Sequence, residues 1–347
     1  MQRHQFTSGY TISRVIKGGW HLAGGHGAID QREAIADMLR FAEAGITTFD
    51  CADIYTGVEA LIGKFLKTHR DAFLSGSLPQ IQVHTKYVPD YDALATLKKE
   101  DTVRIIDRSL QRLGVEQLDL VQFAWWDYQF PGYLETALHL AELKREGKIK
   151  SIGITNFDTE HVQELRAAGV PILSNQVQYS VLDQRVEQDQ PELMNGIDIP
   201  YLCYGTVAGG FLSDAFLHKP TPKAPLENRS LTKYRLIIEE FGSWDLFQKL
   251  LLVLRNIADL HEVGISEIAC QYILQQPGVA GIIVGARNSR HLDKLIQLDT
   301  FSLNAADIHA IQSVIEQANG PSGPFYELER DKTGKHGAIM KYNLNQD

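Results

Sequence analysis

Short apolar runs alternate with longer helix-like stretches along nearly the whole chain, and this alternation limits the possible fold more than any other feature. Repeated strand–helix units predict a parallel sheet covered by helices. Eight such units within 347 residues favour closure into a (β/α)8 TIM barrel, an α/β fold, over an open sheet. The candidate strands are Ile12–Lys17, Thr47–Asp50, Ile81–Lys86, Leu118–Phe123, Ile149–Thr155, Ile172–Gln178, Pro200–Tyr204 and Ala280–Val284.

The helical stretches carry start and stop signals. Asp30 is a plausible N-cap with Glu33 three residues later, and Gly45 closes the far end of that helix. The candidate helices are Asp30–Ala44, Val58–Lys67, Thr102–Leu113, Tyr133–Glu146, Thr159–Ala168, Leu246–Val263, His291–Leu298 and Asn304–Asn319.

Two segments lie outside the repeat. Residues Gly209–Ser243, with three prolines, are expected to form a long irregular loop after the seventh strand; a loop of this length is usually a lid or binding loop, or else disordered. Residues Pro321–Asp347 form a tail that either folds over the barrel mouth or is loosely held. We therefore expect a single barrel domain over residues 1–320, followed by a tail over residues 321–347.

Composition and charge exclude several classes of protein. The formal net charge is −9 and no basic block is interleaved with aromatic residues, so a nucleic-acid partner has no support. No apolar run reaches the roughly 18 residues of a membrane span, and the N-terminus lacks the apolar core of a signal peptide. Cys51, Cys203 and Cys270 follow no disulfide or metal spacing. We expect reduced thiols in a cytoplasmic protein; the sequence does not indicate the number of subunits.

Unusual polar and aromatic residues gather where the expected strands end. The second strand ends in Asp50 and its loop carries Asp53 and Tyr55, and the third strand ends in Lys86. Each residue alone has a common structural explanation, such as a surface lysine, a packed tyrosine or a turn-forming aspartate. A closed barrel brings these strand ends onto one rim, which is where such barrels carry their chemistry.

The chemistry of these residues is coherent. A tyrosine with an ordinary pKa near 10 is a poor acid at neutral pH. A nearby ammonium favours the phenolate, and a carboxylate orients that ammonium and balances its charge. A tyrosine placed beside such an ion pair is a proton donor suited to carbonyl reduction. The hydride must come from a cofactor, because no side chain can supply it.

Five segments, in order along the chain, make the sequence resemble the aldo-keto reductase family. They are TFDCADIYTG (48–57), HTK (84–86), GITNF (153–157), NQVQY (175–179) and IVGARN (283–288). The resemblance implies an NADP-linked oxidoreductase that transfers hydride between nicotinamide and a carbonyl or alcohol substrate. It implies that Tyr55 is the proton donor, that Lys86 lowers the pKa of Tyr55 and that Asp50 holds Lys86.

The resemblance also implies a cofactor site. Asn156 and Gln176 would hold the nicotinamide carboxamide, and Tyr204 would stack on the ring. Arg287 and Arg290 can pair with a 2′-phosphate, which favours NADP over NAD. The full expected cofactor set is Gly19, Trp20, Asp50, Asn156, Gln176, Tyr204, Gly205, Thr206, Gly285, Arg287, Asn288 and His291. The expected substrate-binding set is Trp20, Tyr55, Ala124, Trp125 and Trp126.

One position departs from the family pattern. Ala124 follows the fourth strand where the family usually has a histidine that donates a hydrogen bond to the substrate carbonyl. Losing one oriented donor costs on the order of 10²–10³ in rate. Three explanations stay open: another residue or a water replaces it, the chain is a variant weakened to trap a complex, or the protein has given up ordinary carbonyl reduction.

Two other functions compete with this interpretation. The first is a catalytically weak barrel that binds the dinucleotide and acts as a regulatory or partner-binding subunit, which Ala124 favours. The second is a metal-dependent hydrolase, because His21, His26 and His84 lie near expected strand ends. No His-x-His pair or third ligand accompanies them, so we expect no metal.

Overall fold

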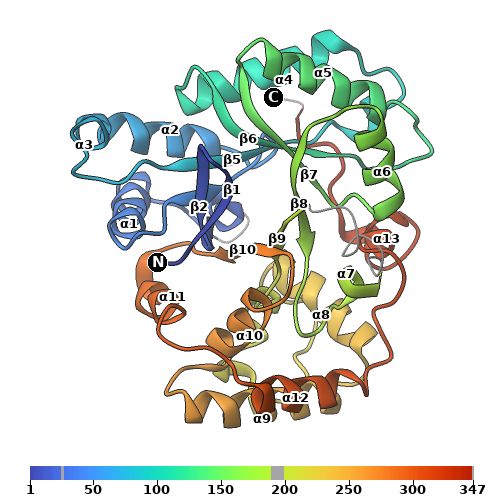
Figure 1. Ribbon diagram of the computed structural model, residues 1–347. Helices are drawn as coiled ribbons and strands as arrows, with labels where there is room; N and C mark the ends of the chain where they lie inside the picture. Colours follow the sequence, from blue (N-terminus) through green and yellow to red (C-terminus); the bar gives the residue numbers. More distant parts are fainter. Residues whose placement is uncertain (25–26, 189–198, 346–347) are drawn as a thin grey trace.

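Eight parallel strands form a closed barrel in the computed structural model, which describes residues 1–24, 27–188 and 199–345. Figure 1 shows the helices arranged around these strands. The strands follow one another around the barrel in chain order, and the last pairs with the first. They are β3 (Val15–Gly18), β4 (Thr48–Asp50), β5 (Gln82–Tyr87), β6 (Leu118–Ala124), β7 (Ile149–Thr155), β8 (Ile172–Gln178), β9 (Tyr201–Tyr204) and β10 (Val279–Gly285). The predicted (β/α)8 fold is confirmed.

The outer helices form where the sequence predicts them, within a few residues at each end. The Asp30 side chain caps α1 by accepting hydrogen bonds from the backbone N–H groups of Arg32 and Glu33. Met38 and Phe41 on the inner face of α1 are buried against the barrel. The predicted helices correspond to α1 (Gln31–Glu43), α2 (Val58–Thr68), α4 (Lys99–Leu113), α5 (Tyr133–Arg145), α6 (Thr159–Ala167), α9 (Trp244–Leu260), α11 (Leu292–Gln297) and α12 (Ala305–Ile315).

The first predicted strand, Ile12–Lys17, is wrong as a single strand. The chain instead forms an antiparallel hairpin of β1 (Arg3–Thr7) and β2 (Tyr10–Ser13) before entering β3. The Ser13 hydroxyl donates to the Val15 carbonyl and accepts from two backbone N–H groups at the start of β4, which turns the chain at this point. Tyr10 and Ile12 of the hairpin pack against apolar side chains of the barrel interior.

The segment Gly209–Ser243 is not one irregular loop. It contains α8 (Arg229–Phe241), which begins where the Asn228 side chain accepts a hydrogen bond from the N–H of Leu231. The three prolines, which favour a loop, all precede this helix. Its apolar residues have helical spacing and are buried, and this spacing was the available signal: Tyr234, Ile237, Ile238 and Phe241. A further helix, α10 (Ile265–Leu274), also escaped prediction, since it is buried on nearly all sides and lacks an amphipathic pattern.

The tail folds over the mouth of the barrel, as far as Asn345. It contains α13 (Glu327–Arg330) and a 3-10 turn at Gly337–Ile339, and Figure 1 shows it crossing from α12 to the opposite side of the molecule near α4. The Arg330 guanidinium donates hydrogen bonds to the carbonyl oxygens of Trp125 at 2.5 Å and Trp126 at 3.1 Å. Asn345, at the other end, donates to the Asp53 carboxylate at 3.0 Å. The tail is thus fastened to loops that follow the barrel strands.

A buried ion cluster holds the tail to the loop after β8. Arg185 is fully buried and donates to Asp183 at 2.7 Å and to Glu329 of α13 at 3.1 Å. Burial raises the pKa of Glu329, but the charges of Arg185 and Lys233 outweigh it and lower that pKa to about 2. The cluster therefore depends on an ionised Glu329 across the usual pH range.

Glu329→Gln should lower the free energy of unfolding at pH 7 by about 3 kcal/mol, because it leaves Arg185 with one buried partner fewer. Urea unfolding measures this value. Because the pKa of Glu329 is about 2 in the folded state and 4.5 as a free side chain, the difference should be complete above pH 4.5. It should then shrink as the pH falls toward 2.

Glu327→Gln is the matched control, since Glu327 lies on the same short helix and is exposed. It should change the free energy of unfolding by no more than about 0.5 kcal/mol. Equal effects of the two substitutions would contradict a specific role for the buried cluster.

Candidate active site

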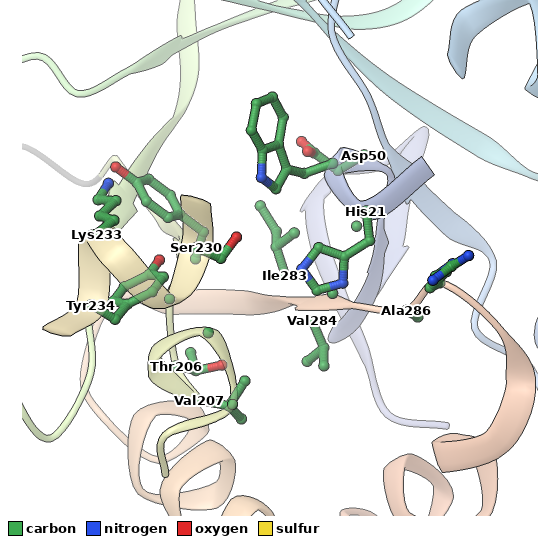
Figure 2. Close-up of a pocket in the computed structure, with 18 of the residues that line it drawn as sticks. His21, Asp50, Thr206, Val207, Ser230, Lys233, Tyr234, Ile283, Val284 and Ala286 are labelled. Carbon is green, nitrogen blue, oxygen red and sulfur yellow. The ribbon is translucent and has the colours of Figure 1, made fainter. Parts of the chain in front are cut away.

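A cavity of about 970 Å³ opens at the carboxyl ends of the barrel strands. Residues of the strand ends, of α8 and of the tail line it, and Figure 2 shows part of this wall. It is the place where barrels of this kind carry their active sites.

The centre of the site is an ion pair between two neighbouring strands. Lys86 Nζ donates to both carboxylate oxygens of Asp50, at 2.9 and 2.7 Å, and to the Cys51 carbonyl at 2.9 Å. Asp50 ends β4 and Lys86 lies near the end of the adjacent β5, so parallel pairing of the strands brings them together. Both side chains are buried, which strengthens their attraction.

Tyr55 lies in the turn that follows β4. Its N–H donates to the Ala52 carbonyl, and its own carbonyl accepts from Val58 at the start of α2, so the turn fixes its position. The Lys86 ammonium lies 5.1 Å from the centroid of the Tyr55 ring. Asp50, Lys86 and Tyr55 are therefore brought together, as the sequence predicts.

The pKa of Tyr55 corrects one detail of the prediction. Burial raises this pKa and the Lys86 charge lowers it, and the net value lies above the ordinary 10. For Lys86 the directions are reversed: burial lowers its pKa, but the charges of Asp50 and Tyr55 raise that pKa above its ordinary value. Lys86 thus acts in the predicted direction, while enclosure of the phenol, which a sequence does not reveal, is the larger effect.

Two glutamine amides orient Asp50. Gln176 Nε2 donates to Asp50 Oδ1 at 2.7 Å, and Gln122 Nε2 donates to the same oxygen at 3.1 Å. Gln176 Nε2 also lies 2.9 Å from Gln122 Oε1. Gln122 was missed from the sequence; its position two residues before Ala124 on an inward-facing strand was the available signal.

Asn156 and Tyr204 lie beside this centre. The Tyr204 hydroxyl donates to the Asn156 side-chain oxygen at 3.0 Å, and the Asn156 N–H donates to the Gln176 carbonyl. Asn156 has a φ of +60°, a conformation that asparagine tolerates better than most residues. Side-chain amides of Asn156 and Gln176 and the ring of Tyr204 therefore line one chamber with Thr155.

The opposite end of the cavity is basic. Arg287, Arg290, His291 and Lys294 line it together with Asn288, whose side chain caps the 3-10 turn after β10. Arg287 also donates to the Ala28 carbonyl at 2.7 Å, so two loops meet there. Gly285, Gly205 and Thr206 line the cavity as well. The separation of an amide-lined chamber from a basic end fits an elongated ligand with phosphate groups.

Gly19 does not line the cavity; its neighbour Gly18 does. The Gly19 N–H donates to the Asp50 carbonyl at 2.7 Å, and a Cβ on Gly19 would lie 2.7 Å from that oxygen. This glycine therefore permits close approach of two strand ends, which differs from the predicted cofactor contact.

The predicted substrate end is aromatic. Trp20 packs edge-on against Tyr55 with ring centroids 5.0 Å apart, and Trp125, Trp126 and Ala124 line the same end. Side chains from α8 and the tail complete this wall and were missed from the sequence, among them Arg229, Lys233, Tyr234, Tyr326 and Met340. They carry no local motif, because only the folding of α8 and the tail over the mouth brings them here.

The three histidines considered as metal ligands do not form a site within the described ranges. His84 is buried in the barrel interior, with Nε2 2.8 Å from the Tyr10 hydroxyl, and burial lowers the pKa of its ring to about 3. His21 packs against Gly285, and His26 lies outside the described residues together with Gly25 of the glycine-rich loop. No group of three His, Cys, Asp or Glu suited to a metal ion occurs among the described residues.

Among residues 1–24, 27–188 and 199–345, no helix is long and apolar enough to cross a membrane.

The chain belongs to the aldo/keto reductase family, whose model matches residues 14–316. It is 26% identical over 328 residues to aldo-keto reductase YhdN of Bacillus subtilis, covering 91% of this chain and 94% of the relative. It is also 26% identical over 333 residues to the NADH-specific methylglyoxal reductase of Escherichia coli, covering 89% and 97%. The family uses nicotinamide cofactors, so this protein is an NAD(P)H-dependent oxidoreductase.

Solved structures agree on the fold. Glycerol dehydrogenase AKR11B4 from Gluconobacter oxydans superposes with a TM-score of 0.75 at 20% identity, covering 93% of this chain and 98% of the other. The thermostable aldo-keto reductase Tm1743 superposes with a TM-score of 0.69 at 23% identity, covering 90% and 100%. At this level of identity the likeness establishes the architecture alone.

Proposed function

We propose that this protein is an NADP-dependent aldo-keto reductase that interconverts a carbonyl compound and its alcohol, with Tyr55, Lys86 and Asp50 at the reaction centre. The observation that carries the proposal is the meeting of these three side chains at the aromatic end of a cavity whose other end is basic. A bound dihydronicotinamide would supply the hydride, which no side chain can provide.

The side chains have distinct roles in this scheme. The Tyr55 hydroxyl donates a proton to the carbonyl oxygen as negative charge develops on it. The Lys86 ammonium, held by Asp50, stabilises the phenolate that remains. Asn156, Gln176 and Tyr204 are suited to hold the nicotinamide, because two amides and an aromatic ring line the chamber beside Tyr55.

Ala124 limits this scheme, because its methyl group cannot donate a hydrogen bond to the carbonyl. The aromatic wall around it, from Trp20, Trp125 and Trp126, can position a substrate by contact, and the indole N–H groups of Trp125 and Trp126 already donate to backbone carbonyls. We therefore expect a reductase that is slow relative to a version with a histidine. A dinucleotide-binding barrel with a regulatory role is the second candidate, and Ala124 is the observation that favours it.

Tyr55→Phe should reduce turnover by at least about 10³-fold, because the substitution removes the proton donor. Steady-state reduction of an aldehyde panel measures the rate. Fluorescence titration should show that the affinity for NADPH changes by less than about threefold, since the ring remains.

Tyr87→Phe is the control, since Tyr87 is a buried tyrosine of β5 whose hydroxyl pairs with Thr102. Normal turnover in Tyr55→Phe would show that the acid is misassigned. Tight NADPH binding with no turnover in the unaltered protein would favour the regulatory candidate.

Ala124→His should raise kcat/KM for simple aldehydes by at least about tenfold, because it restores one oriented donor. The same aldehyde panel is the measurement. An unchanged rate with unchanged cofactor affinity would mean that the alanine does not limit the reaction.

NADPH should bind at least about tenfold more tightly than NADH, because Arg290 and Arg287 lie at the basic end of the cavity, where they can pair with a 2′-phosphate. Arg290→Met should weaken NADPH binding by about tenfold and NADH binding by less than twofold. Arg145→Met, which alters an exposed arginine on α5, is the control. Equal affinity for the two cofactors, or a preference for NADH, would refute the assignment.

A further inference from the structure

Lys233 is a basic side chain of the cavity wall that the proposed reaction does not use. It lies on α8, and Figure 2 shows it across the cavity from His21 and Asp50. Its ammonium is 5.1 Å from the centroid of the Tyr204 ring and 5.9 Å from that of Tyr326. Lys233 therefore lies in the chamber where a nicotinamide and its substrate are proposed to meet.

Lys233 and Arg185 share two buried carboxylates, Asp183 and Glu329. The carboxylate oxygen nearest to Lys233, on Glu329, is 3.8 Å away, which is long for a charge-assisted hydrogen bond. The same carboxylate is already bound by Arg185 at 3.1 Å. Burial and the charge of Arg185 lower the pKa of Lys233 by more than Glu329 and Asp183 raise it, so a further anion beside the ammonium would stabilise its charged form.

Other basic side chains line the cavity together with Lys233. Lys341 of the tail lines the same cavity and has no carboxylate partner among residues 1–24, 27–188 and 199–345. Arg229, one turn before Lys233 on α8, donates to the Ile339 carbonyl. The acid of the reaction centre, Asp50, is neutralised by Lys86. The chamber thus combines aromatic walls with an excess of positive charge.

Lys233 and Tyr55 share this chamber through Tyr326. Tyr55, Lys233 and Tyr326 all line the one cavity, and the Lys233 ammonium lies 5.9 Å from the centroid of the Tyr326 ring. Because Tyr55 and Lys233 line the same cavity, a bound molecule with two polar groups has the phenol and the ammonium available to it as partners.

We propose that Lys233 binds the anionic group of the carbonyl substrate, a carboxylate or a phosphate, while the carbonyl lies at Tyr55. This inference rests on the proposed function and deepens it, because it names the class of substrate. Short-chain oxoacids and phosphorylated aldehydes belong to this class. Neutral aldehydes of the same length lack the group that the ammonium can bind.

Matched substrates test the proposal. The carboxylate arm compares 4-oxobutanoate with its neutral methyl ester, and the phosphate arm compares glyceraldehyde 3-phosphate with glyceraldehyde. In at least one arm, the anionic member should have a kcat/KM at least about tenfold higher, and the arm that shows the preference identifies the anion. No preference in either arm would overturn the proposal.

Lys233→Met should reduce kcat/KM for the preferred anionic substrate by about 10- to 100-fold, mainly through KM, because it removes a charge-assisted hydrogen bond. The neutral partner and the NADPH affinity should change by less than about threefold. Lys335→Met is the matched control, since Lys335 is half-exposed and pairs with Glu239 and Glu240 of α8. Equal losses for anionic and neutral substrates, or a loss confined to NADPH binding, would contradict the proposal.

A binding measurement separates this inference from the proposed function. Calorimetric titration of succinate and of inorganic phosphate into the NADP⁺-saturated protein should show binding of at least one anion, and Lys233→Met should weaken it by at least about tenfold. Anion binding unaffected by Lys233→Met would overturn the inference. If the unaltered protein reduced neither member of either pair, the proposed function would fail, while this titration would still decide whether Lys233 binds an anion.

Discussion

The buried ion pair between Asp50 and Lys86 is the interaction around which the site is organised. Two adjacent parallel strands bring the pair together, and the amides of Gln122 and Gln176 hold the carboxylate from two further strands. Separating the charges in this enclosure would leave each without compensation, which costs several kcal/mol. The position of Lys86 next to the Tyr55 ring therefore follows from the closure of the barrel.

Burial and the neighbouring Lys86 ammonium have opposite effects on the pKa of Tyr55. Burial makes the phenolate of Tyr55 harder to form, and Lys86 makes it easier. In the proposed reaction this balance keeps Tyr55 protonated until a carbonyl oxygen begins to accumulate charge. The tail and α8 contribute to this enclosure, because side chains of both line the cavity and Arg330 fastens the tail to Trp125.

The sequence predicted the barrel and the meeting of Asp50, Lys86 and Tyr55 because the signals for both are local. The apolar runs and the motifs around Asp50, Tyr55 and Lys86 lie within or just after single strands, so strand order alone places them on one rim. The N-terminal hairpin was missed because Ile12 and Ile16 lie in one predicted strand, which a bend at Arg14 divides into β2 and β3. Helix α10 was missed because burial on nearly all sides removes the helical period.

The parts of the cavity wall that come from α8 and the tail could not be predicted in the same way. Lys233, Tyr326 and Arg330 reach the mouth only through tertiary packing, and the buried cluster of Arg185 with Glu329 joins residues that are 144 positions apart in sequence. These elements add basic side chains to the cavity wall, whereas the barrel strands and the turn after β4 supply Asp50, Lys86 and Tyr55.

The most direct test of the account is a crystal structure of the protein with NADP⁺ bound. The account predicts a nicotinamide ring against Tyr204, its carboxamide on Asn156 or Gln176, and the Tyr55 hydroxyl facing the space beside the ring with Lys86 still bound to Asp50. A nicotinamide ring bound elsewhere, or a Tyr55 hydroxyl directed away from it, would contradict the account.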